Sequence, residues 1–178
     1  GQKTIDNIKD SLDFISSSSG RTNIGIAMPI ANQIVSKIKK LEGTLNCEFA
    51  GSLRRGQETI GDIDILLSTE KPDLAIDFFC AMQGVTKVIA KGDTKCSVRL
   101  DTGIQCDLRI VSNNAYGAAL MYFTGSKDHN VQLREIAIKN GLRLNEYGLF
   151  IDSSRDKTPP QNRGIKPIAS KDEKSIYK

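Results

Sequence analysis

Two short segments in which polar and apolar residues alternate constrain the fold most. Residues 62–67 read Asp-Ile-Asp-Ile-Leu-Leu, and residues 104–110 read Ile-Gln-Cys-Asp-Leu-Arg-Ile. Because successive side chains of a strand point to opposite faces, each segment predicts a strand with one apolar face and one polar face. Asp62 and Asp64 share the polar face of the first strand, and Asp107 lies on the polar face of the second. If the two strands are neighbours, three carboxylates converge on one surface.

The rest of the chain predicts further strands and several helices. Apolar residues at helical spacing predict a helix over 5–15 and a second helix that has Pro29 in its first turn and ends at Gly43. The remaining expected elements are strands over 45–50, 61–68, 94–100 and 104–111, helices over 72–82, 114–123 and 127–140, a hairpin around 142–151, and a polar loop or tail over 152–178. This order of elements predicts an α/β or α+β fold.

Composition excludes some classes of protein and site. The 25 Lys and Arg against 21 Asp and Glu give a net charge of +4, which only permits an anionic partner. No run approaches the ~18 apolar residues of a membrane span, so we expect no membrane association. Four cysteines without CxxC spacing predict buried free thiols and a reducing, cytoplasmic compartment, rather than disulfides or a zinc site. The single histidine, His129, excludes a His-rich metal site.

The three aspartates permit two interpretations. Three clustered like charges are costly unless a cation lies among them, and a hard divalent ion bound by carboxylate oxygens would relieve that cost. Magnesium is favoured because it also accepts phosphate oxygens as ligands. The alternative is that Asp62, Asp64 and Asp107 are solvent-exposed residues on a half-buried sheet. Strand alternation alone does not decide between the two.

A turn upstream of the first strand favours the metal interpretation. Gly51-Ser52 follows the strand predicted over 45–50, and Gly61 opens the aspartate strand. A glycine lets the backbone approach an anion, Ser52 offers a hydroxyl group, and Arg55 offers a planar fork suited to a phosphate. Alone, this could be an ordinary turn with solvated arginines. The composite pattern Gly-Ser-x-x-Arg-x₅-Gly-Asp-x-Asp places phosphate donors and metal ligands at one edge of a sheet.

These motifs resemble the signature of the nucleotidyltransferase superfamily. Residues 51–67 are more closely similar to the palm of the family X DNA polymerases, the relatives of DNA polymerase β. Further matching stretches follow in the same order: Lys-Gly-Asp-Thr-Lys (91–95), Asp-Leu-Arg (107–109), Tyr-Phe-Thr-Gly-Ser (122–126) and Asn-Glu-Tyr (145–147). The Ser-Lys-Asp-His-Asn run at 126–130 is similar to bacterial members.

The resemblance implies a role for each matching residue. The carboxylates implied to hold two Mg²⁺ ions, with Mn²⁺ as a substitute, are Asp62, Asp64 and Asp107. The residues implied to bind the nucleotide are Gly51, Ser52, Arg55, Gly61, Tyr122, Phe123, Gly125, Lys127 and Asn130. Arg134 would approach the template strand, and Arg109 would exchange Asp64 for Glu146 and Tyr147 when nucleotide binds.

Several of these roles have a plainer alternative. Tyr122 and Phe123 end an apolar helical run and could be core residues. Asn130 and Arg134, four apart on one helix, could form a solvated face. Lys127 replaces the family's aspartate after Gly-Ser, and it could bind the triphosphate or only neutralise nearby phosphates. Gln105 replaces a basic residue, which weakens the expected contact with the primer phosphate. The role of Arg54 stays open.

The resemblance implies an α+β fold, with a nucleotidyltransferase-like palm of mixed β-sheet and helices followed by a small helix-hairpin subdomain. We expect the end of a helical DNA-binding subdomain over 1–28, the palm over 29–112 and a nucleotide-binding subdomain with a polar tail over 113–178. We expect a catalytic core excised from a longer enzyme, because the motifs of the family's lyase, helix-hairpin-helix and phosphoesterase parts are not found.

The implied activity is template-dependent DNA synthesis in short repair gaps, including base excision repair. DNA and deoxynucleoside triphosphates would be the partners of a monomeric, cytoplasmic protein, associated with the nucleoid if it is bacterial. The alternatives are a template-independent nucleotidyltransferase and a catalytically silent module that binds DNA ends.

Overall fold

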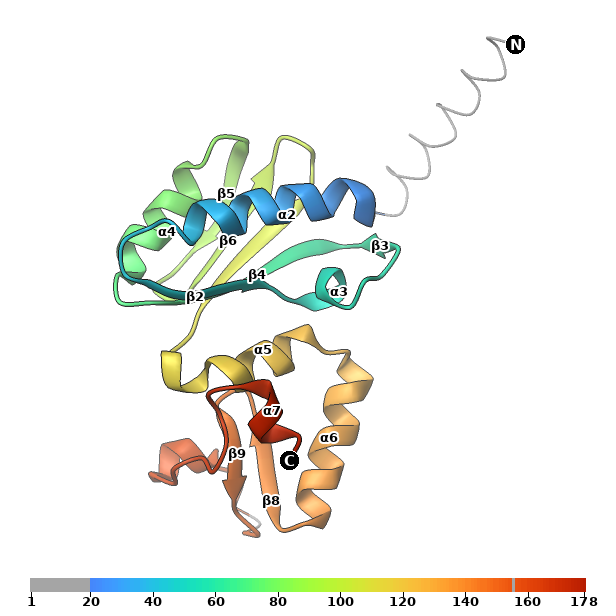
Figure 1. Cartoon of the computed structure of the whole chain (residues 1–178), viewed down its shortest axis with the longest axis vertical. Coiled ribbons are helices and arrows are strands. Elements are labelled where there is room, and N and C mark those ends of the chain that lie inside the picture. The colour runs from blue at the N-terminus through green and yellow to red at the C-terminus, as the bar shows by residue number, and fades with distance from the viewer. Residues whose placement is uncertain (1–19, 155) are drawn as a thin grey trace, which may run out of the picture.

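The computed structural model describes residues 20–154 and 156–178, so the helix predicted over 5–15 lies outside the described residues. Figure 1 shows two bodies stacked along the long axis of the molecule, an upper one built around a sheet and a lower one built from helices and a hairpin. The chain passes from one to the other after β7 (Gln105–Ile110), through the 3₁₀ turn η1 (Asn113–Ala115) into α5 (Tyr116–Thr124).

The upper body contains a five-stranded mixed sheet in the order β2-β4-β7-β6-β5. Besides β7, its strands are β2 (Thr44–Phe49), β4 (Asp62–Thr69), β5 (Val85–Lys91) and β6 (Lys95–Leu100). β4 and β7 are parallel neighbours, and the other adjacent pairs are antiparallel. The two alternating segments are therefore adjacent strands, as their pattern required for the carboxylates to meet.

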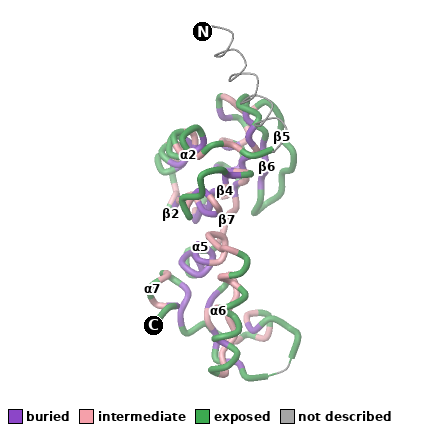
Figure 2. Tube along the Cα trace, turned by 90° about the vertical axis from the view of Figure 1, so that its right-hand side faces the viewer, coloured by how far each residue is buried: buried purple, intermediate pink, exposed green. Residues whose placement is uncertain are grey.

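Two helices, α2 (Ile24–Ile38) and α4 (Pro72–Ala81), bury their apolar sides against one face of this sheet. The apolar residues of β4, β6 and β7 point to that face and form the main core together with Phe79. Figure 2 shows the buried positions gathered along these inner strands and α5. The polar side chains of the alternating strands consequently point to the opposite face, toward the lower body.

The prediction that Pro29 lies in the first turn of the second helix is wrong. α2 begins at Ile24, because the Asn23 side chain caps its N-terminus and accepts a 2.8 Å hydrogen bond from the Gly25 amide. Pro29 therefore lies in the second turn, where it removes one intrahelical hydrogen bond. Two further features were not predicted from the sequence: the small sheet of β1 (Thr22–Asn23) with β3 (Thr59–Ile60), and the strand β5.

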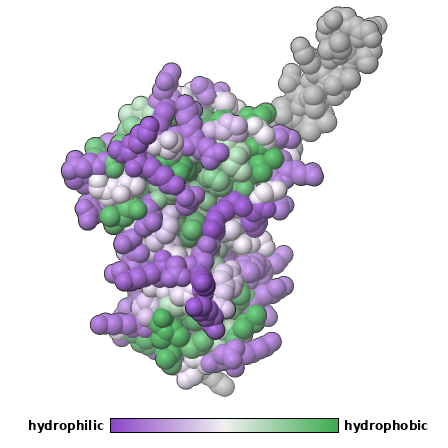
Figure 3. All heavy atoms as spheres, in the orientation of Figure 1, coloured by the Kyte–Doolittle hydropathy of each residue, from purple (hydrophilic) through white to green (hydrophobic). Residues whose placement is uncertain are grey.

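The lower body packs α5 and α6 (Lys127–Lys139) against the hairpin of β8 (Leu142–Asn145) and β9 (Gly148–Ile151). The described residues of 152–178 are mostly loop, as one form of the prediction had it, but they are not a free tail, because the segment packs onto that hairpin. It contains η2 (Pro160–Arg163) and α7 (Glu173–Ile176), and Ala169 forms a β-bridge with Leu149. Figure 3 shows hydrophilic side chains over most of one face, with apolar side chains emerging in separate groups.

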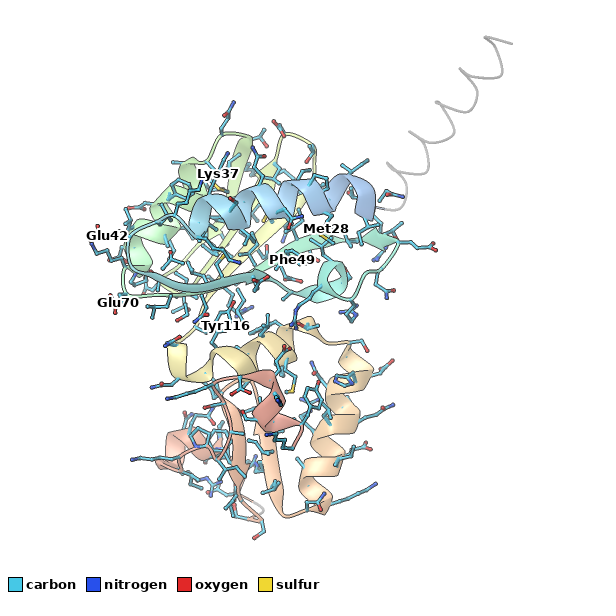
Figure 4. All side chains as sticks on the ribbon, in the orientation of Figure 1. Met28, Lys37, Glu42, Phe49, Glu70 and Tyr116 are labelled. Carbon is cyan, nitrogen blue, oxygen red and sulfur yellow. The ribbon has the colours of Figure 1, made fainter. Side chains whose placement is uncertain are left out.

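A second apolar cluster joins the two bodies. Leu66 lies on the same face of β4 as the aspartates, and it packs with Tyr116, Ala119 and Leu120 of α5. Figure 4 shows Tyr116 at the junction, on α5 beneath the sheet. The three aspartates lie on the same face as Leu66, and Phe123 near the end of α5 lines a small pocket with Asp64 and Asp107. The observed architecture confirms the predicted α+β fold with a mixed sheet followed by a helix-hairpin part.

Candidate functional site

The parallel register of β4 and β7 brings two of the predicted carboxylates side by side. Asp64 and Asp107 are direct register partners, and Asp62 lies two residues earlier on the same face of β4. The apolar residues between them are buried, whereas the aspartates are only partly buried. The expectation that the three aspartates lie on one face of two neighbouring strands is therefore confirmed.

Two polar neighbours hold Asp107. The Lys95 ammonium lies 3.2 Å from Asp107 Oδ2, and the Gln105 amide donates a 2.9 Å hydrogen bond to Asp107 Oδ1. Lys95 comes from β6, where it occupies the register position opposite Arg109. The Asp107 side chain is only 14% exposed, and each of its two oxygens has a protein partner.

The other two carboxyls resist ionisation. Burial first, and then the nearby Asp62 and Asp107 charges, raise the pKa of Asp64 to about 6 against a smaller opposing effect of Arg109 and Lys95. Burial and the charge of Asp107 also raise the pKa of Asp62. Mutual repulsion of this kind favours a cation among the carboxylates.

The donor chemistry fits a hard divalent ion, because carboxylate oxygens are the ligands that Mg²⁺ prefers. The side chains are not arranged as a finished coordination cluster, however. In the parts of the chain that the structure describes, no three Asp, Glu, His or Cys side chains are close enough to form a group that could hold a metal. To bind an ion, Asp107 would have to turn from Lys95 toward Asp62 and Asp64.

Gly51 couples the Gly-Ser turn directly to Asp64. Its backbone φ is +59°, and a Cβ atom built on it would lie 2.2 Å from Asp64 Oδ2. No side chain fits at this position, so the turn that starts α3 (Gly51–Arg54) packs its backbone against the carboxylate. The Ala50 amide also donates a 2.8 Å hydrogen bond to the Asp64 carbonyl. The Gly-Ser turn and the aspartate strand, which are the two parts of the composite sequence motif, are thus in direct contact.

The arginines of the same turn connect the two bodies. Arg54, whose role the sequence left open, forms two 2.7 Å hydrogen bonds to the Glu173 carboxylate of α7 and one to Thr124 Oγ1. Hydrogen bonding to Glu173 raises the pKa of Arg54. Arg55 is exposed and donates to the Thr124 carbonyl at 2.5 Å. Both arginines therefore link α3 to the lower body, but Arg54 is partly buried, whereas Arg55 is exposed beside Gly125.

The predicted nucleotide-contacting residues of the lower body gather around the end of α5. The Tyr122 and Phe123 rings make an edge-to-face contact with centroids 5.2 Å apart, and both side chains are partly exposed, so neither is a fully buried core residue. The Asn130 amide donates a 2.7 Å hydrogen bond to the Tyr122 carbonyl, and its Oδ1 is buried without a hydrogen-bond partner among the described residues. Arg134 is exposed one turn further along α6.

The remaining predicted residues lie around this arrangement. Ser52 is partly buried in α3, and Lys127 is exposed at the first position of α6. Gly61 directly precedes Asp62, and a Cβ built on it would lie 3.8 Å from the Arg21 guanidinium, an ordinary van der Waals distance. His129 is not free, because its Nε2 is 2.9 Å from the Tyr177 hydroxyl.

Arg109 lies between the carboxylates and the Asn-Glu-Tyr turn. Its guanidinium is 4.4 Å from the centroid of the Phe123 ring, an arrangement suited to a cation–π contact. No ion pair joins Arg109 to Asp64 among the residues that the structure describes. Arg109, Phe123, Glu146 and Tyr147 line one pocket of about 260 Å³. Arg109 also lines a smaller neighbouring pocket with Asp64. Both predicted partners of Arg109 are thus within the same neighbourhood.

Sequence reasoning missed three contacts at this site. Lys95 alternates with buried Cys96, so strand alternation could have placed it on the acidic face once β6 was paired with β7. Gln105 precedes Asp107 by two residues and so necessarily shares its face. Glu173 had no detectable signal, because it is 119 residues away from Arg54.

Comparison with known proteins gives matches to both bodies. A family described as DNA polymerase beta palm matches residues 27–100, and one described as DNA polymerase beta thumb matches residues 119–178. The chain is 34% identical over 166 residues to the DNA polymerase/3'-5' exonuclease PolX of Bacillus subtilis. The aligned region covers 92% of this chain and 29% of that protein.

More distant relatives include DNA polymerase lambda of Rattus norvegicus, 24% identical over 75% of this chain and 26% of that protein. Repair DNA polymerase X of African swine fever virus is 25% identical over 75% of this chain and 74% of its own length. The chain thus spans less than a third of the Bacillus and rat proteins. With palm and thumb matched in the expected order, the chain belongs to the family X DNA polymerases, the relatives of DNA polymerase β.

Proposed function

We propose that this chain is the catalytic part of a template-dependent DNA polymerase, which adds deoxynucleotides to a primer 3′-hydroxyl in short repair gaps. One observation carries the proposal: Asp64 and Asp107 lie side by side, with the Gly51 backbone packed against Asp64. This arrangement combines metal-ligand chemistry and a glycine backbone turn on one face of the sheet. Family membership and the PolX relatives support the same activity.

Asp62, Asp64 and Asp107 are the groups that would hold two Mg²⁺ ions, or Mn²⁺ in their place. Such ions stabilise the charge that develops on the attacking and leaving oxygens during phosphoryl transfer. The protein residues then position the reactants. Lys95, which neutralises Asp107 in this structure, would have to release that carboxylate before it could act as a ligand.

The deoxynucleoside triphosphate would bind between the two bodies. Ser52 and the exposed Arg55 offer hydrogen-bond donors for phosphate oxygens, and the Tyr122–Phe123 pair offers an apolar wall for the sugar. Asn130 Oδ1, which lacks a partner among the described residues, would gain one if the side chain turned toward a base. Arg134 is free to approach the template strand because it is exposed on α6.

None of the described helices combines the length and apolarity needed to cross a bilayer. We propose that the protein acts as a monomer in the cytoplasm, with gapped or primed duplex DNA as its partner. Base excision repair is one pathway that produces such gaps.

The test is primer extension on four templates that differ only in the base opposite the gap, in magnesium or manganese. We expect each template to direct insertion of its complementary deoxynucleotide. The same products from all four templates would instead indicate a template-independent nucleotidyltransferase. DNA binding without extension would indicate a catalytically silent end-binding module, and either result would overturn the proposal.

A further inference from the structure

Two cysteines that the proposed chemistry does not use face each other across the core. Cys80 lies in the last turn of α4 and Cys96 lies in β6, with their sulfur atoms 3.1 Å apart. A disulfide bond is about 2.05 Å long, so closing the gap requires a movement of about 1 Å. The other two cysteines, Cys47 and Cys106, are buried and free.

The two thiols differ in their access to solvent. Cys80 is partly exposed, whereas Cys96 is fully buried on the apolar face of the sheet. Burial raises the pKa of Cys96 to about 12, so its thiol is protonated at neutral pH. A reagent in solution therefore reaches Cys80 before it reaches Cys96.

A cation lies beside this pair. Lys91 of β5 is the register partner of Cys96, and its ammonium forms a 2.6 Å ion pair with Asp77, one turn before Cys80 in α4. Lys91 acts to lower the pKa of Cys96, against the larger raising effect of burial. In the described residues no third ligand completes a metal group with these sulfurs, so the pair suits oxidation better than metal binding.

We propose that Cys80 and Cys96 form a reversible dithiol–disulfide site that responds to peroxides. The Cys80 thiolate attacks one oxygen of hydrogen peroxide, which forms Cys80 sulfenic acid and releases hydroxide. The Cys96 sulfur then attacks the Cys80 sulfur and expels the second hydroxide. The protons of the two thiols convert both hydroxides to water. Two thiols lose two electrons in total, and one peroxide is reduced to two waters.

The disulfide would tie α4 to β6 on the face of the sheet opposite the aspartates. It would close a loop of about 17 residues that contains the whole edge strand β5. It would also capture the Cys80 sulfenic acid before irreversible oxidation to the sulfinic acid. The disulfide would thus protect Cys80 from irreversible oxidation and would stiffen the exposed edge of the sheet.

The experiment treats the reduced full chain with hydrogen peroxide and follows intact mass, peptide mapping and melting temperature. We expect the wild type to lose two hydrogen atoms in a Cys80–Cys96 peptide and to melt on the order of 5–10 °C higher. Dithiothreitol should reverse both changes. Cys47→Ala, the matched control, should behave like the wild type because Cys47 is outside the pair.

Two variants separate the two sulfurs. In Cys96→Ala, Cys80 should gain oxygen atoms instead of forming a disulfide, and in Cys80→Ser, Cys96 should stay reduced. Cys80→Ser changes a partly exposed residue, so it keeps the test available if Cys96→Ala fails to fold. The proposal is overturned if wild-type Cys80 accumulates sulfinic acid, if the peptides show another pairing or a disulfide-linked dimer, or if all four thiols survive peroxide.

Discussion

Replacing Gly51 by alanine would test the coupling between the Gly-Ser turn and Asp64. The new Cβ would lie 2.2 Å from Asp64 Oδ2, where an unstrained contact needs more than 3 Å, so the carboxylate has to move by about 1 Å. Gly51 also has a φ of +59°, a conformation that costs an alanine about 1–2 kcal/mol. The variant therefore carries two costs, conformational strain and a displaced carboxylate.

Gly56→Ala is a matched control for the first cost. Gly56 has a φ of +68°, and a Cβ there would meet no atom within 4 Å. Urea unfolding should therefore show about 1–2 kcal/mol lost in Gly56→Ala and a larger loss in Gly51→Ala. A displacement of about 1 Å at a reacting centre can cost ~10²-fold in rate, so single-nucleotide insertion should fall by about that factor only in Gly51→Ala.

The double variant Gly51→Ala/Asp64→Ala isolates the contact itself. Without the carboxylate the clash disappears, so Gly51→Ala should cost only the strain energy in that background. We expect a coupling free energy on the order of 1–3 kcal/mol between the two sites. Additive unfolding free energies, or equal losses of insertion rate in Gly51→Ala and Gly56→Ala, would refute the reasoning.

Three further predictions concern titration, the tie between the bodies and the arginine. With chelator present, stability should fall as pH rises from about 4 to about 6, because the folded chain holds the Asp64 proton longer than the unfolded chain, and Asp64→Asn should flatten this part of the pH curve of urea unfolding. Glu173→Gln should destabilise by about 1–3 kcal/mol, measured in urea, by removing the charged partner of Arg54. Crystal structures with and without nucleotide should show Arg109 moving toward Glu146, and identical Arg109 contacts in both would contradict the predicted exchange.

Strand alternation predicted the acidic face because it depends only on backbone geometry. The pattern around Asp64 and Asp107 specified which side chains share a face, and the parallel register then brought them together. The prediction that Pro29 lies in the first turn was wrong because a capping asparagine, Asn23, starts the helix earlier than the preference of proline indicated.

Contacts between polar side chains that are far apart in the chain could not be predicted from local sequence patterns. Glu173 is charged and lies in a segment rich in polar residues and proline, so the pattern predicted a loop or tail, yet its pairing with Arg54 ties that segment to α3 of the upper body. β5 was missed because it is an exposed edge strand that lacks a clear apolar face. The Lys95–Asp107 pair required knowledge of strand order, which alternation alone does not give.

The most direct test of the account measures single-turnover insertion of one deoxynucleotide by Asp107→Ala in magnesium. Asp101→Ala is the matched control, because Asp101 is exposed in the turn between β6 and β7. We predict that insertion falls by orders of magnitude in Asp107→Ala, while Asp101→Ala keeps the wild-type rate and both variants remain folded. Near-normal, magnesium-dependent insertion by folded Asp107→Ala would contradict the assignment of this acidic face as the catalytic centre.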